Sequence, residues 1–194
     1  MTGFKLNKIK IFVKKETGKI KDLQHGGEHP QRVSANAKKI VHLLGLEEKV
    51  DLNLLTATCY LHDINYAIYQ PGLVNYFLEG KRTKLILPQI INNLGIKGSE
   101  KEIIENAIYN SSFSFPFRKL NKEKDLYSKI LQDADTIDFF SKERIKSFEK
   151  VKKNYFFYTI LGFFSNLAIA YGRNNLKKYL NFPQLAKEFY VQKS

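Results

Sequence analysis

The sequence places two ionisable residues, His62 and Asp63, directly after a strongly apolar stretch. The stretch "LNLLTATCYL" (residues 52–61) has the composition of a core helix, and "HDINY" follows it. Ionisable side chains are rarely buried unless a partner group or a metal ion compensates them. The doublet therefore indicates either a satisfied structural pair near a helix end or a site that performs chemistry.

Two further stretches carry residues of the types that bind metal ions. They are "GGEHPQRV" with His29 and "LQDADTID" with Asp135. Together with the doublet, they would supply two imidazoles and two carboxylates. Such a mixed nitrogen and oxygen set suits Mn, Fe, Co, Ni, Zn or Mg. Metal coordination would explain a His–Asp pair at the end of a core segment, because the cation neutralises and orients both groups.

The order and setting of these residues resemble the HD superfamily of metal-dependent phosphohydrolases, in particular its small stand-alone bacterial and archaeal members. The resemblance rests on His29 in "HPQRV", the doublet in "LHDI" and the distal aspartate in "QDADTID". It spans about residues 22–145, and residues 159–189 are similar to the C-terminal helices of that group. It implies an all-α, HD-type domain.

By this resemblance, the metal ligands are His29, His62, Asp63 and Asp135. In the family, the metal activates a water molecule that attacks phosphorus, because a bound dication lowers the pKa of the water and offsets phosphoryl charge. Asp63 would also orient that water. Arg32 follows His29 by three positions and shares its helix face. It could pair with a carboxylate of the site or with a substrate phosphate, and we include it with Asp63 among the predicted catalytic residues.

Two aspartates compete for the distal ligand position. Asp133 sits where a helix N-cap would be expected, which is a sufficient structural role. Asp135 follows Ala134 and matches the family position, so we choose Asp135. Asp138, one turn further on, is predicted to be a supporting or surface residue.

Family members of this kind often carry additional histidines in the middle of the domain. The corresponding segments here, "LEGKRTK" and "NSSFS", contain none. The whole chain has only four histidines, which are His25, His29, His42 and His62. We therefore predict one divalent metal ion rather than two. The missing histidines also favour an alternative, a weakly active or inactive HD-fold protein that binds nucleotides or nucleic acid.

Three basic residues, Lys81, Arg82 and Arg118, are predicted phosphate contacts, because anion binding near a metal needs such donors. Solvated surface charge is the alternative for each. The net charge of +13 also favours polyanionic partners, nucleic acid among them. The predicted substrate is a nucleotide or a similar small phosphorylated compound, hydrolysed at a phosphate ester or a pyrophosphate bond. A nuclease for single strands is a further alternative.

The elements that must position these residues are predicted to be helices. Apolar residues recur at spacings of three and four between Pro30 and Gly45. Asp51 is the expected N-cap of a helix that runs through Leu61. Further helices are expected at about 74–94, at 99–109 and from Leu126 onward. The pattern predicts an all-α chain.

The length of 194 residues fits one domain. We expect the domain to span residues 21–194, with its core motifs in 25–140 and its C-terminal helices in 142–190. The first twenty residues are ambiguous, because "KIKIFV" is compatible with a short strand or an extended arm. A homodimer is expected from the resemblance alone.

The sequence predicts a cytoplasmic protein that does not enter a membrane. Its single cysteine, Cys59, cannot form an internal disulfide and is expected to be an inert core thiol. The N-terminus lacks the continuous apolar stretch of a signal peptide. The apolar run at 155–171 is short for a membrane span and is interrupted by polar residues, so we expect a buried helix there.

Overall fold

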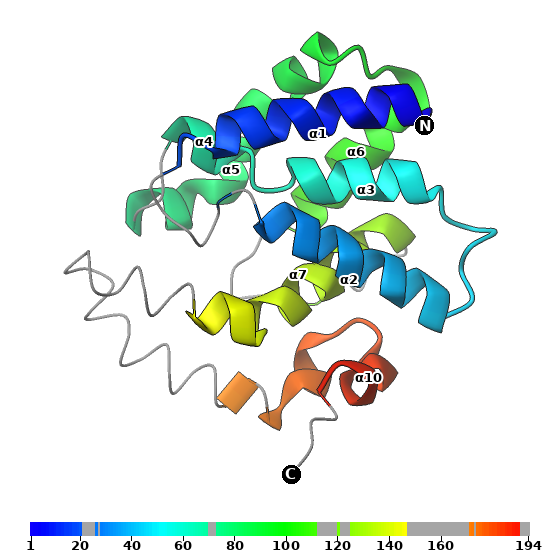
Figure 1. Ribbon diagram of the computed structural model, residues 1–194. Helices are drawn as coiled ribbons and strands as arrows, with labels where there is room; N and C mark the ends of the chain where they lie inside the picture. Colours follow the sequence, from blue (N-terminus) through cyan, green and yellow to red (C-terminus); the bar gives the residue numbers. More distant parts are fainter. Residues whose placement is uncertain are drawn as a thin grey trace.

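The computed structural model of the chain describes residues 1–20, 26, 28–69, 73–111, 120, 125–146, 171–172 and 174–190. All secondary structure within these ranges is helical, which confirms the predicted all-α class (Figure 1). The α-helices are α1 (Gly3–Thr17), α2 (His29–Leu43), α3 (Leu52–Leu61), α4 (Asn65–Tyr69), α5 (Leu73–Asn93), α6 (Gly98–Ser111), α7 (Leu126–Phe139) and α10 (Ala186–Tyr190). Two short 3-10 helices, η1 (Leu176–Tyr179) and η2 (Pro183–Leu185), precede α10.

The helices begin and end at residues whose chemistry favours those positions. Asp51 precedes α3 and accepts hydrogen bonds from two backbone amides of its first turn, at 2.8 and 2.9 Å. Asp125 does the same for α7 with the backbone amide of Tyr127, at 3.0 Å. Such caps satisfy donors that have no partner within the helix. After α2, Gly45 adopts a φ of 61°, which glycine tolerates and which stops the helix.

The predicted strand or arm at the N-terminus is wrong, because residues 3–17 form α1. Its buried side chains recur at helical spacings of three and four, namely Leu6, Ile9, Val13 and Thr17. These residues face α3, against which α1 packs. The short alternation in "KIKIFV" suggested a strand, but the longer period and the tertiary contact decide the outcome.

The helices are arranged so that α3 lies between α1 and α2 (Figure 1). The opposite face of α2 packs against α7, and α6 covers both α3 and α7. Fully buried aliphatic residues fill the space between them, among them Ile40, Leu55, Ile108 and Ile130. This packing brings the start of α2, the end of α3 and the middle of α7 together.

Several predictions fall on residues outside the described ranges. They concern His25, Arg118 and nearly all of the apolar run at 155–171. Among the described residues, no helix combines the length and the apolar character needed to cross a bilayer. The division of the chain into residues 1–20 and 21–194, and the homodimer, remain predictions.

Candidate metal centre

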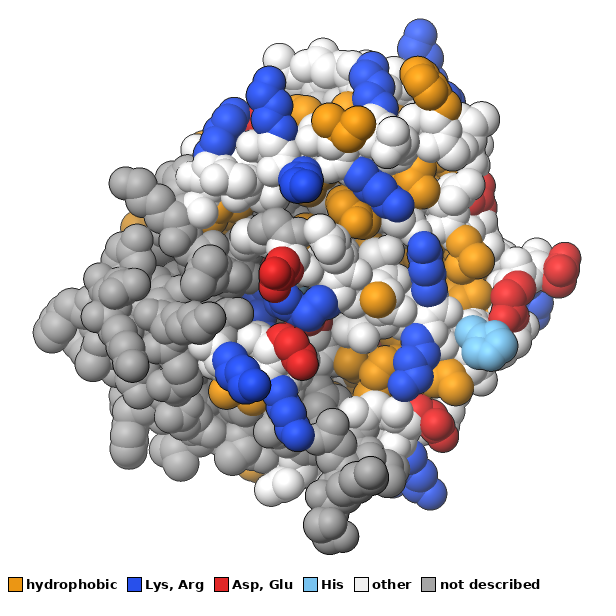
Figure 2. All heavy atoms as spheres, viewed as in Figure 1, with side chains coloured by type: hydrophobic (Ala, Val, Ile, Leu, Met, Phe, Trp, Pro, Cys, Tyr) orange, Lys and Arg blue, Asp and Glu red, His pale blue; other side chains and the backbone are white. Residues whose placement is uncertain are grey.

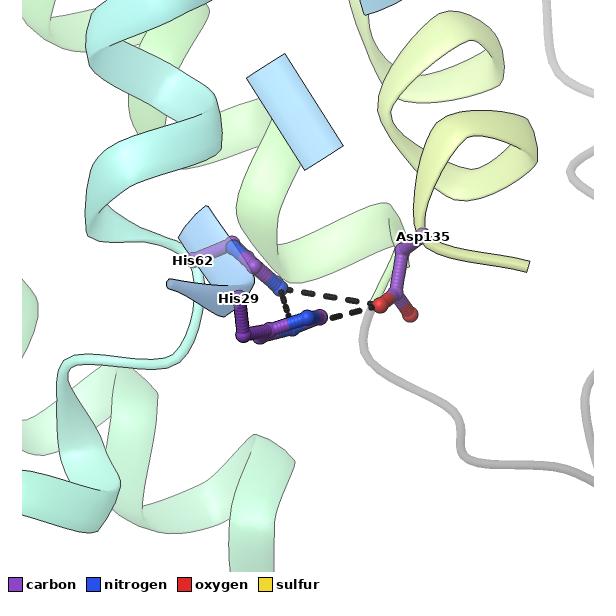
Figure 3. A group of neighbouring side chains, drawn as sticks. All are labelled: His29, His62 and Asp135. Atoms are coloured by element: carbon purple, nitrogen blue, oxygen red, sulfur yellow. Dashed lines mark hydrogen bonds and ion pairs between the residues drawn. The ribbon is translucent and has the colours of Figure 1, made fainter. Parts of the chain in front are cut away.

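Four of the predicted site residues come from three separate parts of the fold. His29 is the first residue of α2, and His62 caps the C-terminal end of α3. Asp63 follows in the turn that leads into α4, and Asp135 lies within α7. Figure 3 shows the side chains of His29, His62 and Asp135 pointing toward one another across the gap between these elements. Residues separated by more than 100 positions in the sequence therefore meet at one point.

The distances between the converging atoms are short. The Nε2 atoms of His29 and His62 are 3.1 Å apart. Asp63 Oδ2 lies 3.1 Å from His29 Nε2 and 3.5 Å from His62 Nε2. Asp135 Oδ1 lies 3.5 and 3.8 Å from the same two nitrogens. Both imidazoles and Asp63 are buried, whereas the Asp135 side chain keeps 21% of its surface exposed, so the site opens to solvent beside Asp135.

These separations fit atoms that share one metal ion. Ligand atoms about 2.1 Å from a common ion lie about 3.0 Å apart at a right angle and about 3.4 Å apart at the tetrahedral angle. The separations of 3.1 to 3.8 Å overlap this range and extend about 0.4 Å above it. Among the residues that the structure describes, His29, His62 and Asp135 form a group that could hold an ion, and Asp63 Oδ2 adds a fourth converging atom.

The second nitrogen of each imidazole explains why both Nε2 atoms point at the same spot. His29 Nδ1 lies 2.7 Å from Asp138 Oδ2, and His62 Nδ1 lies 2.7 Å from the carbonyl oxygen of Cys59. Both partners are acceptors, so each Nδ1 carries the proton and donates. When a ring is neutral, this arrangement directs the lone pair of its Nε2 to the centre. The two Nε2 atoms, 3.1 Å apart, are placed to share a proton in a hydrogen bond or to bind one metal ion.

The protonation of His62 shows the same demand for positive charge. Burial acts to lower the pKa of His62, but the carboxylates of Asp63 and Asp135 outweigh burial and raise it to about 9. A proton on Nε2 supplies positive charge at this point. A metal ion would take the place of this proton, as expected when imidazoles ligate a metal in their neutral form.

Asp138 contacts Nδ1 of His29, the ring nitrogen that points away from the converging atoms. The sequence predicted only that Asp138 is a supporting or a surface residue. Its carboxylate is fully buried and accepts from Arg32 Nε at 2.6 Å as well as from His29. Arg144 Nη1 lies 3.9 Å from the same carboxylate. Burial acts to raise the pKa of Asp138, but the contacts with His29, Arg32 and Arg144 hold it below its ordinary value. A carboxylate behind a ligating histidine fixes the orientation and tautomer of the ring.

Asp133 occupies the opposite side of α7, and the predicted N-cap role is wrong because α7 begins at Leu126. The Asp133 carboxylate accepts from the backbone amides of Asn181 and Phe182 at 2.7 and 2.9 Å. It also accepts from the side-chain amide of Asn181 at 2.9 Å. Asp133 therefore anchors the C-terminal segment to α7, whereas Asp135 faces the two histidines.

The other predicted residues have different surroundings. Arg82 donates to Asn75 Oδ1 at 2.9 Å and stacks 4.5 Å from the Tyr69 ring centroid. Lys81 is exposed. His42 is exposed on α2 beside Glu47, and the Cys59 thiol is buried, where burial raises its pKa. The predicted inert core position of Cys59 is confirmed.

A model of the HD domain family matches residues 26–139, which is more than half of the chain. The chain therefore belongs to the HD domain family. The matched range contains all four converging residues, His29, His62, Asp63 and Asp135. No curated protein and no solved structure matched the chain. HD domains bind divalent metal ions, and the His–Asp cluster described above is where this chain could hold one.

Proposed function

We propose that this protein is a phosphohydrolase that uses one divalent metal ion to hydrolyse a phosphate ester or pyrophosphate bond of a nucleotide or a similar small phosphorylated compound. One observation carries the proposal. Two imidazole Nε2 atoms, 3.1 Å apart, converge with two carboxylates, and the side chain of one of these, Asp135, keeps 21% of its surface exposed. The chain that carries these donors belongs to the HD domain family, whose members are generally phosphohydrolases.

The ligands in this proposal are His29, His62, Asp63 and Asp135. A divalent ion bound by them lowers the pKa of a water molecule and neutralises charge on the phosphoryl oxygens. The protein supplies a buried, fixed set of donors, so little reorganisation is needed when substrate binds. Asp63 is the carboxylate that orients the attacking water and accepts its proton. Asp135, at the open side, faces the direction from which a substrate enters.

Arg32 has a supporting role in this proposal. Its guanidinium donates to both Asp138 oxygens, at 2.6 and 3.3 Å. The same Asp138 carboxylate also accepts a hydrogen bond from His29 Nδ1. Of the two roles open to Arg32 from the sequence, pairing with a carboxylate is therefore the one that these contacts favour. It acts on the metal ligand through Asp138 rather than on the substrate phosphate.

The histidine inventory supports a single metal ion. Four histidines occur in the chain, and of the three that the structure describes, His29 and His62 converge on the site. His42 lies exposed on α2. The two segments that correspond to those in which relatives often have further histidines hold Lys81 and Arg82, and Asn110, Ser111 and Ser112. Ser111 is buried, and its hydroxyl donates to the Ile108 carbonyl.

The test is release of phosphate or pyrophosphate from nucleoside mono-, di- and triphosphates. The protein is first loaded in turn with Mn, Fe, Co, Ni, Zn or Mg. We expect release with at least one metal, and we expect Asp63→Asn to reduce the rate by at least about 100-fold, because it removes a proton acceptor and a charged ligand. The product separates ester hydrolysis from pyrophosphate hydrolysis.

Asp51→Asn is the matched control, because Asp51 is an exposed helix cap at the end of α3 opposite to His62. It should retain the wild-type rate per folded molecule. Equal rates in the two variants, or no release with any metal and any nucleotide, would contradict the proposed function.

A second candidate is binding of nucleotides or nucleic acid without turnover, and the charge of the chain favours it. The net charge is +13, and α1 exposes Lys8, Lys14 and Lys15. In Figure 2, Lys and Arg side chains are spread over the upper part of the molecule, where Figure 1 places α1. Titration with a random single-stranded oligonucleotide at rising salt separates the candidates. Tight binding that weakens steeply with salt favours this second function, and cleavage of the strand would indicate a nuclease.

A further inference from the structure

A chain of buried polar side chains joins α4 to α5 just beyond the His62–Asp63 doublet. Asn65 and Thr83 are fully buried, and Asn75 keeps only 2% of its surface exposed. The Asn65 side-chain amide donates to Thr83 Oγ1 at 3.1 Å, and that of Asn75 donates to Asn65 Oδ1 at 3.1 Å. Buried amides are tolerated only when they are hydrogen-bonded. The network therefore fixes the position of Asn75 relative to the start of α4.

The network ends at Arg82. Its Nη1 donates to Asn75 Oδ1 at 2.9 Å, and its guanidinium lies 4.5 Å from the centroid of the Tyr69 ring. Both partners are neutral. Within the part of the chain that the structure describes, no carboxylate pairs with Arg82. Arg32 differs in this respect, because its charge is compensated by Asp138.

An arginine held in this way is suited to bind an anion. The guanidinium has five N–H donors in a rigid fork, and Asn75 occupies only part of it. Stacking on an aromatic ring restricts the side chain without neutralising it. Because the ordering of a long side chain opposes binding, an arginine that is already ordered binds an anion more tightly than a mobile one.

The position of the network connects this arginine to the metal centre. Asn65 comes two residues after Asp63, and the backbone amide of Tyr66, the next residue, donates to the Asp63 carbonyl oxygen at 3.0 Å. The turn that carries Asp63 therefore also carries the first residue of the network. Lys81, the neighbour of Arg82, is exposed, and no residue in the described ranges holds it in a comparable way.

We propose that Arg82 binds a phosphate oxygen of the substrate and that Asn65, Asn75, Thr83 and Tyr69 position it for this role. The inference rests on the proposed function for the identity of the anion. It selects Arg82 over Lys81, which the sequence could not distinguish. It also predicts that the contact depends on residues that do not touch the anion themselves.

The experiment is calorimetric titration of the full-length, metal-loaded protein with inorganic phosphate, which cannot be turned over. Arg82→Gln should weaken phosphate binding by about ten-fold, which corresponds to about 1.4 kcal/mol. Lys81→Gln removes the same charge from the adjacent position and should weaken binding by less than about two-fold. Tyr69→Leu removes the stacking ring from a position that is 37% exposed, so the fold should persist while binding weakens by less than in Arg82→Gln.

Equal affinities in wild type and Arg82→Gln, or equal losses in Arg82→Gln and Lys81→Gln, would overturn the inference. The same phosphate titration on chelator-treated protein shows whether the contact with Arg82 persists without the metal ion on which the proposed function depends. If nucleotides are not hydrolysed but phosphate binding still depends on Arg82, the proposed function fails and the anion site stands. If nucleotides are hydrolysed and phosphate binding is independent of Arg82, only the anion site fails.

Discussion

Two faces of the same helix, α7, present carboxylates to different partners. On one face, Asp133 accepts three hydrogen bonds from amide groups of Asn181 and Phe182. On the other, Asp135 and Asp138 approach imidazole nitrogens of α2 and α3. The three aspartates lie within six residues of sequence, so residue type and neighbourhood in the chain are nearly the same for all of them.

The difference lies in the donors that each carboxylate meets. Amide groups are fixed hydrogen-bond donors, so the folded chain alone satisfies the Asp133 carboxylate. Asp135 instead faces the Nε2 atoms of His29 and His62, at 3.5 and 3.8 Å. Burial acts to lower the pKa of His62, but Asp63 and Asp135 raise it to about 9, so these carboxylates favour a cation at the centre, either a proton or a metal ion. Fixed amide donors hold Asp133 in place, whereas Asp135 lies beside two nitrogens that can ligate a metal ion.

Between the two faces of α7, the larger change in metal affinity is expected from Asp138→Asn. The substitution preserves shape but removes the charge that holds His29 in its metal-binding orientation. We expect metal affinity to fall by about 10–100-fold. Competition with a chromophoric chelator measures the affinity. The tautomer of His29, observed by ¹⁵N NMR, should lose its preference for the proton on Nδ1.

A purely structural role for Asp138 would lower stability without moving either readout. Unchanged metal affinity and an unchanged His29 tautomer in folded Asp138→Asn would therefore contradict the role assigned to it. Arg32→Gln should weaken metal binding in the same direction, because it removes the donor at 2.6 Å that holds Asp138 in place.

Asp133→Ala is expected to lower stability and to leave metal affinity nearly unchanged, which is the opposite of the result expected from Asp138→Asn. This change leaves backbone amides of Asn181 and Phe182 without their acceptor and should lower the free energy of unfolding by about 1–3 kcal/mol. Metal affinity of the folded protein should stay within about two-fold of wild type, because Asp133 faces away from the histidines. Chemical denaturation and the same chelator competition provide the two numbers. Loss of metal with intact stability would reverse the roles of Asp133 and Asp135.

Much of the fold could be predicted because local signals are strong where helices start and stop. Asp51 was expected as the N-cap of a helix through Leu61, and α3 has these bounds. The expected starts near Pro30 and Leu126 match α2 and α7 within one residue. The N-terminal helix was missed, because six residues of alternation gave a local strand pattern, whereas burial against α3 is a property of the whole fold.

The site was predictable in part for a similar reason. The convergence of His29, His62, Asp63 and Asp135 was expected from the resemblance to the HD superfamily. The structure places both carboxylates within 4 Å of the two histidines. The partner of Asp138 could not be read from the sequence, since His29 lies 109 positions away. Its position three residues after Asp135 was the only available signal, because that spacing places both on one helix face.

Arg82 illustrates the same limit. Next to Lys81 in the sequence, it looks like an equivalent surface charge. Only the fold shows that Asn75 and Tyr69 hold Arg82 while Lys81 stays exposed. Side-chain identity predicts which residues can bind an anion, and tertiary contacts decide which of them is ordered enough to do so.

The most direct test of the metal centre is elemental analysis of untagged protein purified without chelator, compared with His62→Ala. His42→Ala is the matched control, because His42 is exposed on α2 and pairs with Glu47. The account predicts about one divalent metal ion per chain in wild type and in His42→Ala, and none in His62→Ala. Two ions per chain, equal metal in His62→Ala and wild type, or no metal after reconstitution with Mn or Fe would contradict it.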